Sequence, residues 1–249
     1  MSIYTKPLPL QNRIWELDFF RGIALLLMIY FHIIYNLKEF YNSPVSYSWG
    51  LNYYIGKVSV VLFMLISGIS CRFSRNVIRN GVKILGVALI ISFVTHLADY
   101  LAVSVAHFSS SYMGIKFGVL HFFGISMLLF PVLEKISPYL LVALSAGIIA
   151  LGQVFSRLST SLDFLFPIGI INSRFYSSDY YPLVPWLGVF IIGIALGKLI
   201  YREKRSIFRF SIKDNIISTL GRNTLLVYVV HQPLILLILA AINFFVFKI

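Results

Sequence analysis

The stretch DFFRGIALLLMIYFH, residues 18–32, is apolar enough to cross a membrane, yet it contains an aspartate, an arginine and a histidine. A membrane-spanning helix needs about 20 mostly apolar residues, and the flanking sequence extends this run to roughly residues 17–38. A charged side chain that faces lipid at depth costs at least about 2.5–3.5 kcal/mol. We therefore expect Asp18, Arg21 and His32 to face protein or a water-filled cavity.

In a helix, His32 follows Arg21 after about three turns, so the two side chains lie on one face, about 16 Å apart along the axis. Asp18 lies one turn before Arg21 and can pair with it. One interpretation is structural: the Asp18–Arg21 pair anchors the helix, and His32 forms a hydrogen bond between helices. For Asp18 the structural and functional interpretations weigh equally. For Arg21 and His32 together, one face and two depths favour a pathway lined by both.

The composition places this stretch in an integral membrane protein. The 249 residues are 59% hydrophobic and 12% charged, whereas a soluble domain is nearer half apolar and a quarter charged. We predict an all-α fold, a polytopic transmembrane helical bundle of about seven spans, in one domain over residues 1–249. The candidate spans are roughly residues 17–38, 54–71, 82–101, 117–134, 138–156, 182–201 and 222–246.

The distribution of basic residues predicts the orientation. The net charge of +12 would also fit nucleic-acid binding, but the placement of the charges between spans explains it. One side receives Lys116, Arg157, Arg174 and Lys248. The side of the N-terminus receives most of the remaining basic residues outside the spans. They are Lys6, Arg13, Arg72, Arg75, Arg79, Lys83, Lys135, Lys198, Arg202, Lys204, Arg205, Arg209, Lys213 and Arg222. Basic residues gather in cytoplasmic loops, so the N-terminus is expected in the cytoplasm, and no nucleic-acid partner is needed.

The second span contains a face of small and polar residues. It consists of Gly56, Ser59, Phe63, Ser67 and Ser70. Their helical spacing lets another helix or a ligand come close, and plain helix packing is the favoured interpretation for the serines. Lys57, near the outer end of this span, is expected to reach the lipid headgroups.

Histidines recur in the third and fourth spans. His96 shares a face with Ser92 and Asp99, and a carboxylate one turn away would orient the imidazole; a solvated pair at the interface is an equal alternative. His121 has a glycine about one turn to either side, which suggests space beside it.

The last span places Thr224, Tyr228 and His231 on one face, with Gln232 beside them. Pro233 removes a backbone donor from the helix. Buried polar side chains near the middle of a membrane are costly if they are merely structural. We therefore favour a site-lining role for this face.

Familiar soluble-enzyme motifs are missing from the sequence. It contains no GxSxG, Walker A, GxGxxG, HExxH or CxxC motif, so hydrolase, nucleotide-binding and zinc chemistry have no support of that kind. Five histidines and one cysteine without ligand spacing predict no metal site.

Several stretches, taken in order, resemble the catalytic-domain family of heparan-alpha-glucosaminide N-acetyltransferase, a family of the wider transmembrane acyltransferase group. They are RIWELDFFRGIALLLMIYFH, LFMLISGIS, FGVLHFFGIS, DYYPLVPWLGVFIIGIALG and LGRNTLLVYVVHQP. The resemblance runs from about residue 13 to residue 235, and it is the ordered set that makes it specific.

The resemblance implies a reaction that the residues alone do not supply. Arg21 and His32 match a first-helix arginine and histidine that recur in the wider group. The implied reaction takes acetyl-CoA from the cytoplasm and presents its acyl group to an acceptor on the far side. Animal members look to have a histidine in the first external loop, and YNSPVSYSWG, residues 41–50, has none. His32 therefore becomes the preferred general base.

The expected roles follow from these observations and the resemblance together. Catalysis is assigned to His32, with His121 and His231 as further candidates. Donor binding is assigned to Arg21, Arg72, Arg75, Arg79, Ser67, Tyr228 and Gln232. Tyr228, His231 or Gln232 would also stabilise the developing oxyanion. His96 and Asp179 are candidates for acceptor binding, and Asp179 alternatively caps the next helix.

The predicted function is thus an acetyl-CoA-dependent N- or O-acetyltransferase of the cell membrane, with several spans. Expected partners are membrane lipid, acetyl-CoA and a glycan or amino-sugar acceptor, and a homodimer is compatible with the sequence. The alternative is a small-molecule transporter or channel whose polar stripes line a permeation path. No clear inverted repeat supports that alternative.

Overall fold

The computed structural model describes residues 14–106, 113–210, 212 and 214–247, and these form eight α-helices. The helices are α1 (Trp15–Tyr41), α2 (Gly50–Cys71), α3 (Val77–Ala106), α4 (Val119–Leu133), α5 (Pro138–Phe155), α6 (Leu183–Leu199), α7 (Ile216–Arg222) and α8 (Thr224–Ile242). Within the described residues, extended pairing is limited to isolated bridges. The all-α prediction is therefore confirmed.

The predicted spans correspond to α1 to α6 and α8. Five of them, α1, α2, α3, α5 and α8, are long and apolar enough to cross a membrane, whereas α4 and α6 are apolar but shorter. The short helix α7 does not correspond to a predicted span; it ends at Arg222, and Asn223 alone separates it from α8. Lys6, Arg13, Lys213 and Lys248, which the charge argument used, lie outside the described residues.

Local sequence signals fix several helix ends. Ser137 caps α5 by accepting the N–H of Leu140, directly before a proline at the first helical position. Asn215 caps α7 in the same way through Ser218, and Asn42 ends α1 in the left-handed conformation. These are the residue types that helix termini prefer.

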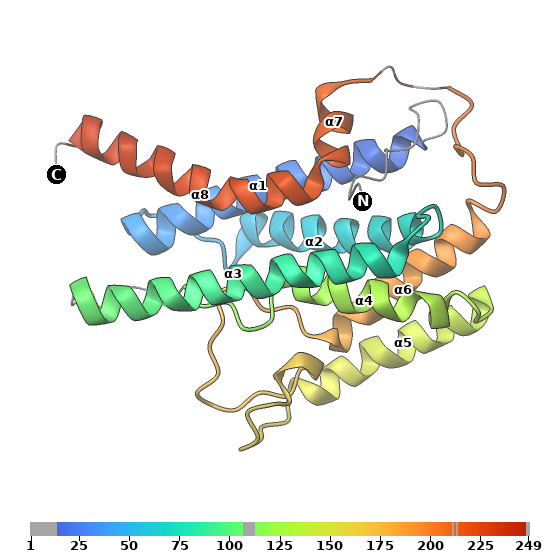
Figure 1. The fold of residues 1–249 in the computed structure, drawn as a ribbon, viewed down its shortest axis with the longest axis horizontal. Helices are drawn as coiled ribbons and strands as arrows, with labels where there is room; N and C mark the ends of the chain where they lie inside the picture. Colours follow the sequence, from blue (N-terminus) through green and yellow to red (C-terminus); the bar gives the residue numbers. More distant parts are fainter. Residues whose placement is uncertain (1–13, 107–112, 211, 213, 248–249) are drawn as a thin grey trace, which may run out of the picture.

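Apart from α7, which runs across it, the helices follow the long axis of the molecule roughly, with α1 and α8 on one side and α5 on the other (Figure 1). We call the end where α1 starts the Trp15 end, and the opposite end the Tyr41 end. The short helices α4 and α6 lie toward the Trp15 end (Figure 1). The loops that precede them therefore lie beside the middle of the bundle, and this places Asp179 within hydrogen-bond reach of Tyr228.

The core lies where α2, α4 and α6 meet. Met64, Phe122 and Phe190 are fully buried there. A Cβ atom at Gly68 would overlap the carbonyl oxygen of Phe190, and one at Gly193 would overlap that of Leu65. Small residues at such crossings let membrane helices pack backbone to backbone.

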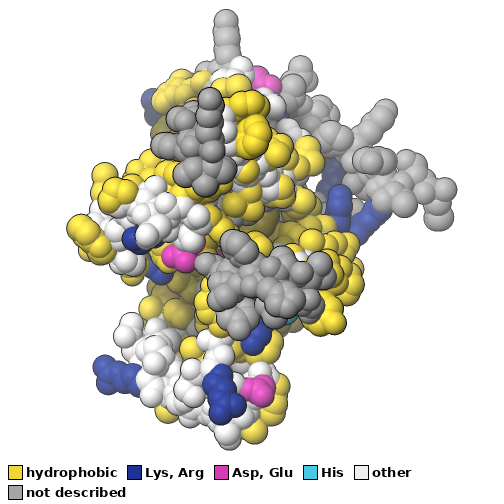
Figure 2. Space-filling view, turned by 90° about the vertical axis from the view of Figure 1, so that its left-hand side faces the viewer, with side chains coloured by type: hydrophobic (Ala, Val, Ile, Leu, Met, Phe, Trp, Pro, Cys, Tyr) yellow, Lys and Arg dark blue, Asp and Glu magenta, His cyan; other side chains and the backbone are white. Residues whose placement is uncertain are grey.

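The outer faces of the helices expose large hydrophobic side chains. Examples are Phe93 on α3, Tyr139 on α5 and Leu237 on α8, and hydrophobic atoms cover much of the face seen from the Tyr41 end (Figure 2). Exposed apolar area of this extent marks contact with lipid or protein. Together with the long apolar helices, it makes the chain a multi-pass membrane protein.

Candidate active site

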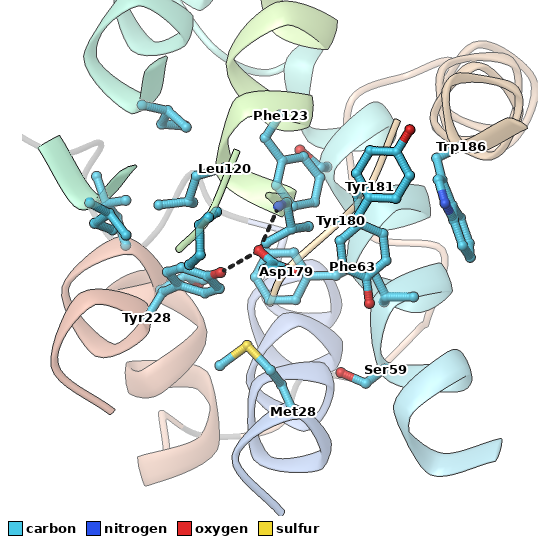
Figure 3. A pocket seen from close by; sticks show the side chains of 18 of the residues that line it. Met28, Ser59, Phe63, Leu120, Phe123, Asp179, Tyr180, Tyr181, Trp186 and Tyr228 are labelled. Carbon is cyan, nitrogen blue, oxygen red and sulfur yellow. Dashed lines mark hydrogen bonds between the residues drawn. The ribbon is translucent and has the colours of Figure 1, made fainter. Parts of the chain in front are cut away.

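A cavity of about 1570 Å³ runs through the bundle. Near the Trp15 end it is lined by Asp18, Arg21 and Ser70, and toward the Tyr41 end by Tyr35 and Tyr47. Its middle part is drawn in Figure 3, where Met28, Ser59, Phe63, Asp179 and Tyr228 surround one space. The cavity therefore links the two ends of α1 past the middle of the membrane-spanning helices.

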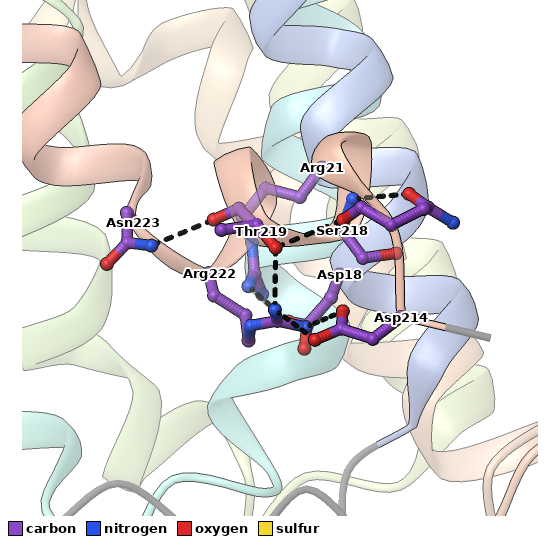
Figure 4. A network of polar contacts seen from close by, with 8 residues as sticks. Asp18, Arg21, Asp214, Ser218, Thr219, Arg222 and Asn223 are labelled. Atoms are coloured by element: carbon purple, nitrogen blue, oxygen red, sulfur yellow. Dashed lines mark hydrogen bonds and ion pairs between the residues drawn. The ribbon is translucent and has the colours of Figure 1, made fainter.

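Arg21 lies in the cavity wall and joins three helices. Its guanidinium donates to Asp18 Oδ1 at 3.2 Å, to Ser70 Oγ at 2.6 Å and to the carbonyl oxygen of Gly221 at 3.4 Å. Figure 4 shows Asp18 and Arg21 beside the polar residues of α7. The predicted Asp18–Arg21 pair is present, so Arg21 is at once a tie between α1, α2 and α7 and a cation facing the cavity.

His32 has one ring nitrogen engaged and one available. Its Nδ1 lies 2.9 Å from the carbonyl oxygen of Met28. A carbonyl only accepts, so Nδ1 carries the proton and Nε2 keeps its lone pair. The half-buried ring lines the cavity. His32 is thus arranged as a proton acceptor.

His231 repeats this arrangement from α8. Its Nδ1 donates to the carbonyl oxygen of Tyr228, and its Nε2 is buried without a hydrogen-bond partner among the described residues. The two imidazole centroids are 4.8 Å apart. Two residues that lie far apart in sequence therefore bring two imidazoles, each with a free Nε2 lone pair, to one wall of the cavity.

Tyr228 and Gln232 extend this wall. The Tyr228 hydroxyl donates to Asp179 Oδ2 at 3.4 Å, and the Gln232 amide donates to Asn36 Oδ1 at 2.9 Å. Both residues line the cavity, as the helical spacing of the last span predicts. Because Nε2 of His231 is an acceptor, this histidine does not fit the oxyanion role, which needs a donor.

The prediction that Asp179 caps the next helix is wrong. Its carboxylate accepts the N–H of Val119 at 2.9 Å, so it binds the start of the preceding helix α4, whereas the next helix α6 has no side-chain cap. The physical reason is the short length of α4, which brings its free amides level with this loop. Burial raises the pKa of the Asp179 carboxyl to about 6. Asp179 also lines the cavity.

His121 lies at the start of α4 rather than in the large cavity. Its Nδ1 accepts the N–H of Gly118 at 3.2 Å, and its Nε2 lies 3.3 Å from Ser92 Oγ. That hydroxyl donates onward to the carbonyl oxygen of Ile115, so Nε2 carries the proton. Nδ1 is therefore used in capping α4 and Nε2 in joining α4 to α3, and His121 does not line the cavity that contains His32.

His96 and Asp99 do not form the expected pair. Asp99 accepts the N–H groups of Met113 and Gly114, and His96 donates to the carbonyl oxygen of Ser92. The Asp99 carboxylate thus satisfies backbone amides of the loop before α4, which need acceptors. His96 is exposed and lies outside the residues that line the cavity.

The predicted donor-binding arginines of the first basic cluster also lie outside that lining. Arg72 pairs with Glu134 at 3.1 Å and donates to the carbonyl oxygen of Gly197, which ties α2 to α4 and α6. Arg75 and Arg79 are exposed at the start of α3. By contrast Ser67 lines the cavity, as does its whole helical face. The favoured packing interpretation also holds for this face, because Ser59 donates to the carbonyl oxygen of Ala24 on α1.

Other cations line the cavity at the Trp15 end and were not singled out from the sequence. They are Lys83 on α3, Lys204 in the loop after α6, and Arg222 on α7. Arg222 is held by two hydrogen bonds to Asp214, at 2.7 and 2.8 Å. Lys83 and Lys204 form no ion pair within the described residues. The basic composition of these segments indicates cations on this side of the membrane. It does not indicate which of them face the cavity, because the direction of each side chain depends on the tertiary fold.

Comparison with known proteins decides the family. The model of the family described as "Heparan-alpha-glucosaminide N-acetyltransferase, catalytic" matches residues 13–233. The chain belongs to this family. The predicted resemblance is confirmed, and membership indicates a membrane acetyltransferase. It favours this activity over the transporter alternative. Neither the curated proteins nor the solved structures gave a match.

Proposed function

We propose that this family member transfers an acetyl group from acetyl-CoA, bound at the Trp15 end, to an amine or hydroxyl of a glycan or amino-sugar acceptor from the other side. The observation that carries this proposal is the cavity itself. It joins a cationic mouth, with Arg21, Lys83 and Lys204, to the free lone pair of His32.

The donor site at the Trp15 end follows from charge. The phosphates of CoA are anionic, and cations at a cavity mouth raise the local concentration of an anion. Lys83 and Lys204 are the cations there without an ion-pair partner among the described residues, so they would meet the phosphates. The pantetheine arm would then extend past Arg21 and Ser67 toward His32, which lies about 16 Å from Arg21 along α1.

His32 acts as general base. Its Nε2 removes the proton from the acceptor as the nitrogen or oxygen attacks the thioester carbonyl. The C–S bond then breaks, and the CoA thiolate takes the proton back from the imidazolium. The Tyr228 hydroxyl is the donor from this wall that suits the developing oxyanion, because its present bond to Asp179 is long at 3.4 Å.

The orientation completes the proposal. All seven apolar helices, including α4 and α6, cross the cell membrane as one domain, with the Trp15 end in the cytoplasm. Support comes from the basic residues Arg72, Lys135, Lys198 and Arg205, which all lie at or beyond the helix ends on that side. This arrangement places the CoA pool and the cationic mouth in the same compartment.

The test is transfer of labelled acetyl from acetyl-CoA to glucosamine by purified protein. His32→Ala should lower the rate about 10²–10⁴-fold, the usual contribution of a general base. His96→Ala is the matched control, since His96 lies outside the cavity lining, and it should retain the rate. Full activity of His32→Ala would overturn the role of His32, and no transfer to any amine or hydroxyl by the folded wild type would overturn the function.

A further inference from the structure

Lys57 lies in the cavity wall, and its ammonium group contacts two aromatic rings. The Nζ atom lies 5.4 Å from the centroid of the Tyr53 ring and 5.3 Å from that of Trp186. Trp186 belongs to α6, so the side chain bridges from α2 to another helix. Cation–π contacts of this kind hold an ammonium in place without neutralising it.

This lysine lies at the depth of the proposed base. A Cβ atom on its neighbour Gly56 would lie 2.5 Å from the ring of Phe31, and Phe31 precedes His32 on α1. Lys57 and Trp186 both line the cavity that contains His32. Lys57 is exposed, so its contact with the lipid headgroups stays a prediction, and its contact with Trp186 keeps the side chain at the cavity wall.

The charges around Lys57 leave it uncompensated. Away from the Trp15 end, Asp179 is the acidic residue among those that line the cavity. Its carboxylate is already bound by Val119 and Tyr228. Glu39, toward the Tyr41 end, accepts from the Tyr47 hydroxyl. Within the described residues Lys57 has no ion pair or hydrogen bond, so its three N–H donors remain for a ligand.

We propose that Lys57 binds a negatively charged group, a phosphate, sulfate or carboxylate, carried by the acceptor, so that anionic amino sugars are preferred over neutral ones. The cavity wall beside Lys57 suits a sugar ring because it is aromatic. Tyr181 and Trp186 lie there with their ring centroids 5.4 Å apart (Figure 3). The identity of the anion's carrier rests on the proposed function; the anion site does not.

The experiment measures binding without donor, so that it does not depend on catalysis. Calorimetry compares glucosamine 6-phosphate with glucosamine on the purified protein. The wild type should bind the phosphate-bearing sugar about tenfold more tightly, as expected for a charge-assisted hydrogen bond. Lys57→Gln should remove this preference, and Lys57→Arg should retain most of it.

Lys38→Gln is the matched control, because Lys38 lies at the same end of the molecule but outside the cavity lining; it should keep the preference. Equal binding of both sugars by the wild type, or a preference that survives in Lys57→Gln, would overturn the proposal. A second arm uses nanodiscs with and without phosphatidylglycerol. If this lipid stabilises the wild type but not Lys57→Gln, and the two sugars bind alike, the anion belongs to a lipid and the acceptor assignment is wrong.

The proposed function fails separately from this inference. If Lys57 provides the preference but no acetyl group reaches either sugar from acetyl-CoA, the anion site stands and the transferase proposal does not. If glucosamine and its phosphate are acetylated and bound equally well, the transferase stands and the role of Lys57 does not.

Discussion

The chemistry of His32 depends on a backbone hydrogen bond one turn away. The carbonyl oxygen of Met28 fixes which nitrogen carries the proton, and the same device on α8 fixes His231. Helical spacing predicts that Arg21 and His32 share a face. It cannot predict the tautomer or the approach of the two imidazoles to 4.8 Å, because both depend on how α8 packs against α1.

Asp179 provides a prediction at the same scale. Its carboxyl has a pKa of about 6 in the folded protein, against about 3.9 in an unfolded chain. The folded state therefore binds more protons between these values, and this group's contribution to the free energy of unfolding falls as the pH rises from about 4 to about 6. Asp179→Asn cannot titrate, so the stability of the wild type relative to the variant should be greater at pH 4.5 than at pH 7.

Thermal unfolding of both proteins in detergent measures this difference. Asp163→Asn serves as the control, because Asp163 is exposed and lies outside the cavity lining. A wild-type advantage that stays constant, or that grows as the pH rises, would contradict the buried, proton-binding state of Asp179.

Among the elements, α7 is the one that the hydropathy pattern misses and the site needs. It crosses α1 so closely that a Cβ atom on Gly221 would overlap the carbonyl oxygen of Asp18, and one on Gly22 would overlap that of Ile217. The same crossing brings the carbonyl of Gly221 to Arg21. A seven-residue helix is too short for a hydropathy window to detect. The sequence around Gly221 also does not indicate that this glycine packs against α1.

This crossing predicts the effect of one methyl group. Gly221→Ala should destabilise the protein by about 1–3 kcal/mol, since overpacking against backbone cannot relax cheaply. The control is Gly147→Ala on α5, where no atom outside the helix lies within 4 Å of the added Cβ. Alanine favours a helix over glycine by about 1 kcal/mol, so the control should be neutral or slightly stabilised. Equal melting temperatures for the two variants would show that α7 is not packed in this way.

The long helices are the elements that can be predicted from the sequence. Runs such as residues 54–71 are predicted well because lipid requires a nearly continuous apolar surface. The face from Gly56 to Ser70 on α2 was also visible, but small residues serve helix packing and ligand approach equally. In the structure this face does both: Ser59 donates to the carbonyl oxygen of Ala24 on α1, and the same face lines the cavity. This double role follows from the whole bundle.

For the whole molecule, the charge pattern predicts a cationic side but misplaces the cations that face the cavity. Arg72 was expected to bind the donor and instead ties three helices together. Lys83 lies one helical turn beyond Arg79 and turns toward the cavity, and Lys204 reaches it from a loop. The direction of a basic side chain at a membrane surface is set by tertiary folding, which composition does not encode.

Donor binding in this cavity is tested by the heat of binding of acetyl-CoA to the purified wild type and to two matched double variants. We expect micromolar binding that weakens at least about tenfold in Lys83→Gln with Lys204→Gln, because two phosphate contacts are lost. Arg75→Gln with Arg202→Gln removes the same charge from exposed positions outside the cavity lining, and it should bind like the wild type. Absence of binding in the folded wild type, or a loss that follows the arginine pair instead, would contradict the donor route through this cavity.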